Sequence, residues 1–189
     1  MLIARAGPRP GEHAVHIGAG VGYYTAIIAR MVGTDGRVTA IEYDPDLAAR
    51  LAVNFGSQPN VRAVEGDGTK IDFNPADVIY ANAGVTRPVD LWLDRLNDGG
   101  RMILPLTKSK DAGGAWFGIE RRGDGFFAKW IFAADLFPCE GARDAESELA
   151  LVAALEKGGW DRVTRLYRRG DVPEEQCWLK GPDWCLAYD

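Results

Sequence analysis

Three glycines at every second position, Gly18, Gly20 and Gly22, are the residues of this sequence best suited to holding a ligand. They follow an apolar run at 13–17 and precede a helical pattern, so they predict a tight turn between a strand and a helix. Glycine lets the backbone approach a ligand closely or take positive φ angles, and the first turn of a helix offers unpaired N–H groups. The pattern indicates a nucleotide site. An ordinary glycine-rich turn could have the same sequence, and the GxGxG spacing differs from the dinucleotide-binding GxGxxG.

Two carboxylates stand where the next strands are expected to end. Glu42 closes an apolar run at 38–41, and Asp67 follows another at 61–64. Ligands of an open α/β sheet bind at the carboxyl ends of its strands, so Glu42 can accept both hydroxyls of a ribose and Asp67 can accept from an exocyclic amine. The alternatives are a solvated strand end for Glu42 and a side chain–backbone turn for Asp67. Together with the glycine turn, the two carboxylates favour an adenosine-containing ligand.

The elements that must position these residues alternate between strands and helices. Apolar runs predict strands at 13–17, 38–41, 61–64, 77–81 and 101–105. Helices are predicted at 22–32 before a Gly33 cap, from the cap Asp44-Pro45 onward, and near 88–97, with a turn at 97–100. The alternation indicates βαβ units, and therefore an α/β fold with a doubly wound, mostly parallel sheet.

After residue 114 the pattern changes to strands in sequence, followed by a mixture of helix and strand. The turn at 122–125 lies between β-rich runs at 115–121 and 126–132, which predicts an antiparallel hairpin at one edge of the sheet. The tail is predicted to form strands joined by turns. We expect a cofactor-binding core at 1–140 and a C-terminal α+β extension at 141–189, packed on the same domain.

One helix is predicted in the extension. Asp144 can cap it, and Gly158-Gly159 can end it. Its expected apolar positions are Leu149, Val152, Ala153 and Leu155.

Composition limits the classes of function. The length of 189 residues and the hydrophobic share of 47% suit one globular domain. A net charge of −5 argues against a nucleic-acid partner, although a local basic patch stays possible. The sequence has no apolar run of about 18 residues and no signal-peptide core at its start, so we expect no membrane span and a cytoplasmic location. Three cysteines without a CxxC pair predict reduced thiols, and with two histidines no metal site is expected.

The motifs resemble those of class I S-adenosylmethionine-dependent methyltransferases, and more narrowly those of the protein-L-isoaspartate O-methyltransferases. The resemblance rests on IGAGVGY at 17–23, IE at 41–42, EGDG at 65–68 and GGRMILP at 99–105. It extends over about residues 8–138. It implies a Rossmann-like fold that binds S-adenosylmethionine and releases S-adenosylhomocysteine as product.

The resemblance also implies which residues contact the cofactor. They come from the glycine turn and from the ends of the next three strands. They are Gly18, Gly20 and Gly22 beneath the methionine part, Glu42 at the ribose, Tyr43 beside the adenine ring, Asp67 at the adenine amine, Asn82 beside the transferred methyl, and also Ala19, Tyr23 and Gly68.

The sequence departs from the family pattern in three places. His16 stands where the family has an acidic residue, and it can either accept a hydrogen bond from the cofactor or be a packed strand-end histidine. The segment before residue 13 is shorter than the family's acceptor-shaping segment, so we expect cofactor binding with little or no turnover from this chain alone. The residues after 140 do not match the family ending and can replace acceptor surface or form an oligomer contact.

The implied reaction is transfer of a methyl group to a protein or peptide carboxylate. Such an acceptor is already ionised at neutral pH, so positioning supplies most of the rate, and the sequence identifies no catalytic residue. The alternatives are a methyltransferase of the same fold acting on a small molecule or RNA, and a cofactor-binding or interaction module without turnover. The negative net charge makes RNA the weaker option. A dehydrogenase is disfavoured because the third glycine falls one residue early.

Overall fold

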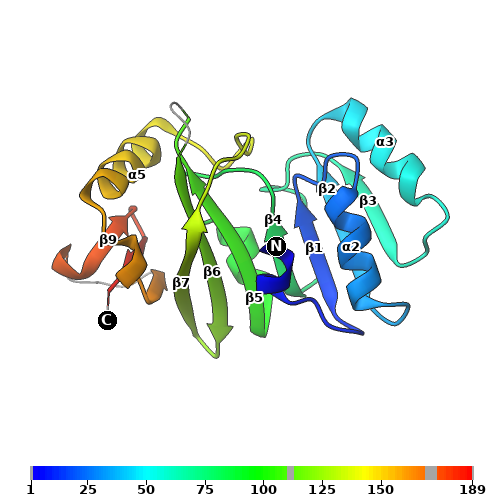
Figure 1. The fold of residues 1–189 in the computed structure, drawn as a ribbon, viewed down its shortest axis with the longest axis horizontal. Helices are drawn as coiled ribbons and strands as arrows, with labels where there is room; N and C mark the ends of the chain where they lie inside the picture. The colour runs from blue at the N-terminus through cyan, green and yellow to red at the C-terminus, as the bar shows by residue number, and fades with distance from the viewer. Residues whose placement is uncertain (1, 110–112, 169–173, 189) are drawn as a thin grey trace.

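The chain folds around one long mixed sheet in the computed structural model, which describes residues 2–109, 113–168 and 174–188 (Figure 1). Within these residues ten strands follow the order β3-β2-β1-β4-β5-β6-β7-β8-β10-β9. The strands are β1 (His13–Ile17), β2 (Arg37–Glu42), β3 (Val61–Glu65), β4 (Ala76–Ala81), β5 (Leu96–Thr107), β6 (Gly114–Arg122), β7 (Gly125–Ala133), β8 (Arg165–Arg168), β9 (Cys177–Lys180) and β10 (Trp184–Ala187). The helices are α1 (Leu2–Ala6), α2 (Tyr23–Val32), α3 (Pro45–Phe55), α4 (Asp90–Asp94) and α5 (Ala145–Lys157), with the 3-10 turns η1 (Trp160–Arg162) and η2 (Glu174–Gln176). The predicted α/β fold with a parallel core is confirmed.

The first five strands form a parallel half whose ends converge on one edge. β1 lies between β2 and β4, so the strand order reverses at β1. Ile17, the last residue of β1, is opposite Ile41 of β2 and Ala81 of β4. The segments that begin at Gly18, Glu42 and Asn82 therefore leave the sheet at nearly the same level. A ligand of an open α/β sheet binds at such a switch point.

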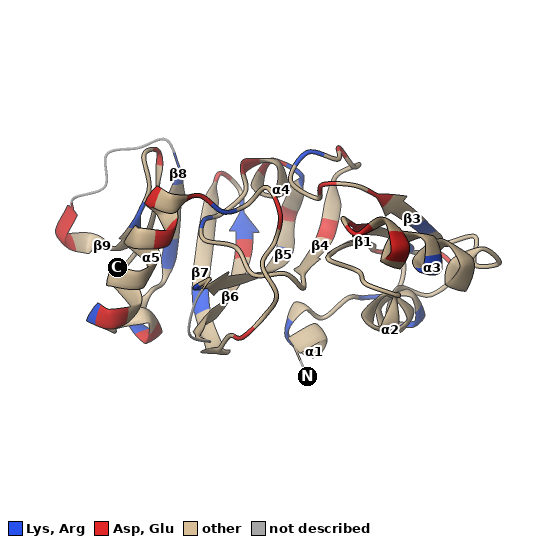
Figure 2. Ribbon diagram, turned by 90° about the horizontal axis from the view of Figure 1, so that it is seen from above, with Lys and Arg blue, Asp and Glu red and all other residues tan. Residues whose placement is uncertain are grey.

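Helices cover both faces of the parallel half. Figure 2 shows α1 and α2 on one side of the sheet and α4 on the other. On the first side, Ile28 and Val32 of α2 and Ile3 of α1 are fully buried in one cluster with Val38 of β2. Lysine and arginine residues are interspersed with acidic residues along the ribbon rather than gathered on one side (Figure 2).

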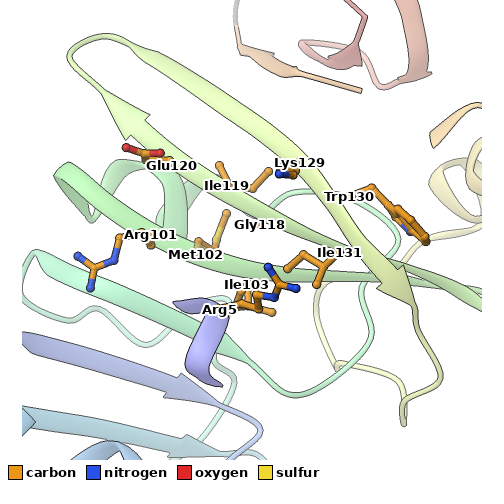
Figure 3. A pocket seen from close by; sticks show the side chains of 10 residues that line it. All are labelled: Arg5, Arg101, Met102, Ile103, Gly118, Ile119, Glu120, Lys129, Trp130 and Ile131. Carbon is orange, nitrogen blue, oxygen red and sulfur yellow. The ribbon is translucent and has the colours of Figure 1, made fainter. Parts of the chain in front are cut away.

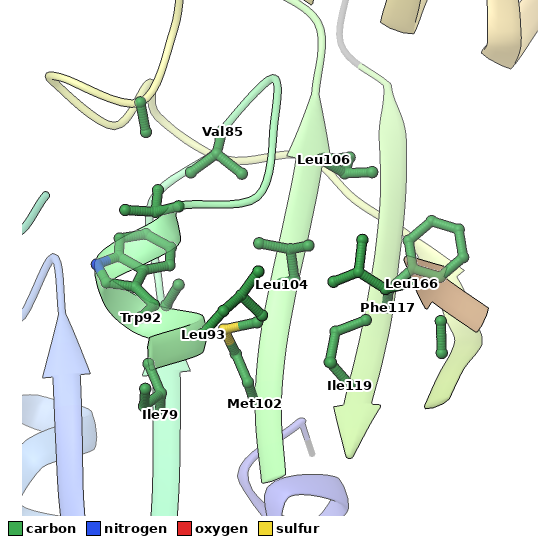
Figure 4. Packing of buried hydrophobic residues seen from close by; sticks show 14 of the residues in the cluster. Ile79, Val85, Trp92, Leu93, Met102, Leu104, Leu106, Phe117, Ile119 and Leu166 are labelled. Atoms are coloured by element: carbon green, nitrogen blue, oxygen red, sulfur yellow. The ribbon is translucent and has the colours of Figure 1, made fainter. Parts of the chain in front are cut away.

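The larger core cluster lies beneath α4. Trp92 and Leu93 of this helix are buried together with Ile79 and Met102 (Figure 4). Burying each such side chain stabilises the fold by about 1.5–3 kcal/mol. The indole N–H of Trp92 donates to the carbonyl of Gly68 at 2.8 Å, so the core also anchors the segment that follows β3.

Two helix ends match the sequence prediction. The Asp44 carboxylate accepts from the backbone N–H groups of Asp46 and Leu47 at 3.0 Å each, and Pro45 is the first residue of α3. Gly33 ends α2 with a φ of 69°, and its N–H donates to the carbonyl of Ala29.

The helix predicted near 88–97 is shorter than expected, and the turn predicted at 97–100 is wrong. α4 ends at Asp94, and residues 97–100 lie inside β5. Leu96 already pairs with Ala76 of β4, and the register then shifts so that Arg101 is opposite Val78. The additional residues of β5 are accommodated by this irregularity, which includes Gly99 with a φ of 73°.

The predicted hairpin is confirmed, and the sheet continues beyond it. β6 and β7 pair antiparallel up to Arg122 and Gly125, with Gly123 between them at a φ of 58°. β8 then pairs with β7, and β10 pairs with both β8 and β9. The antiparallel part is therefore longer than one hairpin, because three strands of the C-terminal extension join the same sheet.

Helix α5 begins after the predicted cap Asp144 and ends at the predicted glycine, but it buries a different face. Leu151 and Ala154 are buried, whereas Leu149 is 73% exposed and the other expected positions are exposed or half-buried. The buried face packs in the same core cluster as Trp178 of β9, whose indole N–H donates to the carbonyl of Ala154 at 3.1 Å.

The prediction of three reduced thiols is wrong for two of them. Cys177 and Cys185 lie on the adjacent strands β9 and β10, with their Cα atoms 5.8 Å apart, and they form a disulfide. Cys139 is buried and free. In the described part of the chain, no helix is long and apolar enough to span a membrane. Nor do histidines, cysteines and carboxylates gather there as a metal site would need.

Candidate functional site

A cavity of about 230 Å³ lies at the carboxyl ends of β1, β2 and β4. It is bordered by the glycine turn, by the residues after β2, β3 and β4, and by a segment that returns after β7. The lining residues are Ile17, Gly18, Ile41, Glu42, Tyr43, Asp44, Gly66, Gly68, Ala83, Pro138, Cys139 and Glu140. The structure thus brings together residues from four of the predicted stretches, including the one after β4, and adds a fifth that the sequence did not indicate.

The glycine turn has the backbone that the sequence predicted. Gly18, Gly20 and Gly22 have φ angles of 71°, 56° and 98°, in the region that favours glycine. A Cβ at Gly22 would overlap the ring of Phe55, whereas around a Cβ at Gly20 no described atom lies within 4 Å. Gly22 is therefore required by packing within the protein, and Gly20 faces open space. The N–H of Ala19 is tied to the carbonyl of Ile41 at 3.1 Å, which fixes the turn against β2.

Glu42 connects the glycine turn to the start of α3. Its side chain is buried, with 8% of the residue exposed. One carboxylate oxygen accepts from the N–H of Gly20 at 2.6 Å, and the other accepts from the N–H of Asp44 at 3.0 Å. Each oxygen has a further lone pair, so this carboxylate can position the turn and still accept from a ligand hydroxyl.

Asp67 forms the side chain–backbone turn that was the alternative interpretation of this residue. Its Oδ1 accepts from the N–H of Thr69 at 2.9 Å and from the Thr69 hydroxyl at 2.7 Å, while Lys70 lies 2.9 Å from Oδ2. Burial alone would raise the pKa of Asp67, but the hydrogen bonds from Thr69 and Lys70 outweigh it and hold the pKa below its usual value. The carboxylate is therefore ionised at neutral pH beside the cavity wall formed by Gly66 and Gly68.

His16 is a packed strand-end histidine, one of the two alternatives that the sequence left open. It is fully buried, its Nδ1 is 2.8 Å from the hydroxyl of Thr25, and its ring lies against those of Tyr24 and Tyr80. Burial lowers its pKa to about 3, so the ring is neutral. Its Nε2 is buried and has no hydrogen-bond partner among the described residues. His16 does not line the cavity.

Of the other predicted residues, Tyr43 lines the cavity, whereas Tyr23 and Asn82 do not. Tyr43 lines it and is 56% exposed. Tyr23 is 70% exposed, packs edge-on against Tyr24, and is not among the lining residues. Asn82 is tied to β1 through its N–H, which donates to the carbonyl of Ile17 at 2.8 Å. The next residue, Ala83, lines the cavity.

The fifth border of the cavity is the covering segment, residues 137–141, which lies between β7 and α5. Pro138 bridges to Gly84 in the loop after β4. The N–H of Gly84 donates to the carbonyl of Phe137 at 2.7 Å, and the N–H of Cys139 donates to the carbonyl of Gly84 at 2.8 Å. Burial first, and the nearby carboxylates of Asp67 and Glu140 next, raise the pKa of Cys139 to about 12.

The sequence did not indicate the covering segment as part of the site. Its residue types carry no nucleotide-binding signal, and its partner Gly84 is more than fifty positions earlier in the chain. Only the pairing of these two loops shows that the segment closes the cavity.

A larger cavity of about 500 Å³ lies elsewhere, on the face of β5, β6 and β7 beside α1 (Figure 3). Apart from Arg5 of α1, its lining residues lie within the strands rather than at their carboxyl ends. The guanidinium of Arg101 at its border already forms hydrogen bonds within the protein, to the carbonyls of Ala6 and Gly7 and to the carboxylate of Glu12. This cavity contains none of the residues that the sequence predicted for cofactor binding.

Comparison with known proteins agrees with the geometry of the strand ends. The family model of protein-L-isoaspartate(D-aspartate) O-methyltransferase matches residues 7–130. A Methanopyrus kandleri protein-L-isoaspartate O-methyltransferase is 38% identical over 104 residues, which cover 52% of this chain and 46% of that protein. Arabidopsis thaliana protein-L-isoaspartate O-methyltransferase 2 is 35% identical over 107 residues, 51% of this chain and 35% of its own. The chain thus spans about half or less of the length of these curated relatives.

Solved structures show the same fold. One protein-L-isoaspartate O-methyltransferase superposes with a TM-score of 0.69 at 26% identity, covering 82% of this chain and 48% of that one. A Plasmodium falciparum protein described as a candidate member of the same enzyme class, in complex with S-adenosyl-L-homocysteine, gives a TM-score of 0.59 at 17% identity, covering 70% and 67% of the two chains. At that identity the second likeness supports the fold alone.

Proposed function

This chain belongs to the protein-L-isoaspartate(D-aspartate) O-methyltransferase family, and we propose that it forms the cofactor-binding core of an S-adenosylmethionine-dependent methyltransferase acting on a protein carboxylate. The observation that carries this proposal is the cavity at the ends of β1, β2 and β4, where the glycine turn meets the buried carboxylate of Glu42.

The residues around this cavity suit the proposed cofactor. A Cβ at Gly18 would lie 3.1 Å from the Cβ of Ala83, so glycine leaves room where the turn and the loop after β4 approach each other. Glu42 retains acceptor capacity for the two ribose hydroxyls. Tyr43 is exposed at the border, where its ring can lie beside a base, and Asp67 is ionised close to the same wall.

The chain's own contribution to the reaction is proposed to be positioning. S-adenosylmethionine supplies an already electrophilic sulfonium methyl, and a carboxylate acceptor is ionised at neutral pH. Ala83 and the covering segment, which pairs with Gly84, border the side of the cavity where we place the acceptor. Holding the acceptor in line and excluding water there would account for the rate without a general base.

The acceptor is proposed to be a protein or peptide carboxylate, because the curated relatives carry the name of protein-L-isoaspartate methyltransferases. A cytoplasmic location and an oligomer contact through residues 141–189 remain predictions. The disulfide between Cys177 and Cys185 argues against the predicted cytoplasmic location, because cytoplasmic thiols are usually kept reduced.

Calorimetric titration of the chain with S-adenosylhomocysteine tests the proposal, with NADH as the control ligand. We expect binding of the first and none of the second. A transfer assay with radiolabelled S-adenosylmethionine then compares an isoaspartyl peptide with the same peptide containing aspartate. Absence of S-adenosylhomocysteine binding by the folded chain would refute the proposal. Binding with equal transfer to the two peptides would refute the acceptor alone, whereas binding without transfer to either agrees with the low turnover expected of this chain by itself.

A further inference from the structure

Arg143 lies just after the covering segment and contacts three other parts of the chain. Its guanidinium donates to the carbonyl of Gly84 at 2.8 Å and to the carbonyl of Thr107 at 2.7 Å. It also contacts the Thr107 hydroxyl at 3.1 Å, the hydroxyl of Ser109 at 2.9 Å and the carboxylate of Glu148 at 2.6 Å. Its side chain is only 14% exposed. These contacts link the loop after β4, the end of β5 and helix α5 to one side chain.

The contact with Gly84 connects Arg143 to the cavity. The same carbonyl accepts from the N–H of Cys139, which lines the cavity. The carbonyl of Ala142, beside Arg143, accepts from the N–H of Thr86 at 3.1 Å, so the loop and the segment are paired over several residues. On the side of helix α5, Glu148 accepts from the N–H of Ser109 at 2.6 Å, and this bond fixes the carboxylate that Arg143 binds.

We propose that Arg143 is a positioning residue of this cavity: it holds the covering segment against the loop after β4, and through Glu148 it couples the C-terminal extension to the cofactor site. The inference rests on the proposed function for the identity of the ligand. The guanidinium is occupied by carbonyls and a carboxylate, so it acts through the backbone that it holds and does not bind the cofactor itself.

Lysine cannot reproduce this arrangement. Arginine presents a planar fork of five N–H donors, whereas lysine has one ammonium that cannot reach two carbonyls and a carboxylate in different directions at once. In Arg143→Lys the covering segment is expected to stay closed only part of the time. If the closed fraction falls to about one tenth, the apparent dissociation constant for S-adenosylhomocysteine rises about tenfold.

Arg101→Lys is the matched control. Arg101 is 18% exposed and, like Arg143, donates to two backbone carbonyls and one carboxylate, those of Ala6, Gly7 and Glu12. It holds α1 and the linker that follows this helix, and it does not line the cavity at the carboxyl ends of β1, β2 and β4. We expect both lysine variants to lower the melting temperature by similar amounts, but only Arg143→Lys to weaken S-adenosylhomocysteine binding.

Amide hydrogen exchange of the ligand-free chain is the second measurement. Arg143→Lys should speed exchange in peptides that contain Gly84 and Cys139, and Arg101→Lys should not. If wild type binds no S-adenosylhomocysteine, the proposed function fails, while the exchange data still decide whether Arg143 holds the segment. Should Arg143→Lys not fold, Glu148→Gln serves instead, because it weakens the ion pair and keeps the arginine. It should weaken binding in the same direction by a smaller factor.

The inference is overturned if Arg143→Lys binds S-adenosylhomocysteine with wild-type affinity and exchanges like wild type at the covering segment. It is also overturned if Arg101→Lys weakens S-adenosylhomocysteine binding as much as Arg143→Lys does, because the weaker binding would then come from a general loss of stability.

Discussion

Gly141 is the position where a single methyl group should separate the covering segment from the residues beneath it. It has a φ of 78°, and a Cβ there would lie 2.6 Å from one carboxylate oxygen of Asp67 and 2.5 Å from the hydroxyl of Thr69. Asp67 cannot easily move aside, because Thr69 and Lys70 hold both of its oxygens. In Gly141→Ala either the covering segment must lift or these hydrogen bonds must break.

The expected cost has two parts. A non-glycine residue in the left-handed region costs about 1–2 kcal/mol. Losing a hydrogen bond to the charged carboxylate of Asp67 costs about 1.5–3 kcal/mol more. Gly11→Ala isolates the first part, because Gly11 has a φ of 84° and a Cβ there would have no described atom within 4 Å. The difference between the two variants should therefore be about 1.5–3 kcal/mol in the free energy of unfolding.

Urea unfolding followed by tryptophan fluorescence measures this difference, and calorimetry measures the affinity for S-adenosylhomocysteine. If the strain at Gly141→Ala makes the closed covering segment less favourable by about 1.4 kcal/mol or more, the affinity should fall about tenfold or more. Gly11→Ala should bind like wild type. If the two variants are equal in stability and in affinity, the contact between the covering segment and Asp67 does not exist as described.

Four other measurements test separate parts of the structure. Gly20→Val should fold with reduced stability and lose S-adenosylhomocysteine binding in calorimetry, because its side chain fills open space next to Glu42; normal binding would make the turn purely structural. Glu42→Gln should weaken that binding about 10- to 100-fold, because the glutamine NH2 group would face one of the two N–H groups that the two oxygens of Glu42 now accept from; unchanged affinity would remove Glu42 from the site. The folded protein keeps His16 neutral down to about pH 3 while the unfolded chain protonates it near 6.5, so stability is full above pH 6.5 and falls by about 2 kcal/mol at pH 5. In pH-dependent urea unfolding, His16→Gln should lack this part of the loss, and an unchanged pH dependence would contradict the burial of the ring. Maleimide labelling at pH 7.5 with mass detection should modify no thiol of the native protein, Cys139 alone after unfolding, and three thiols after unfolding with reductant; three labelled thiols in the native state would disprove the disulfide.

The local features of the site could be predicted from the sequence because short-range chemistry determines them. The glycines at 18, 20 and 22 take positive φ angles as expected, since only residues without a Cβ adopt them readily. Asp44 caps α3 because its carboxylate can reach the N–H groups two and three residues later. The placement of Glu42 at the carboxyl end of a parallel strand followed from the alternation of strands and helices alone.

Tertiary structure decided everything that depends on contacts between distant residues. His16 became a buried, neutral side chain because α2 and β4 place Thr25 and Tyr80 around it. Helix α5 buries Leu151 and Ala154 in a cluster with Trp178 of β9, a distant partner that the pattern within the helix does not predict. The bond between Gly84 and Phe137 closes the cavity across more than fifty residues. A sequence pattern encodes which conformation a short segment prefers, whereas the pairing of two remote loops depends on the whole sheet that brings them together.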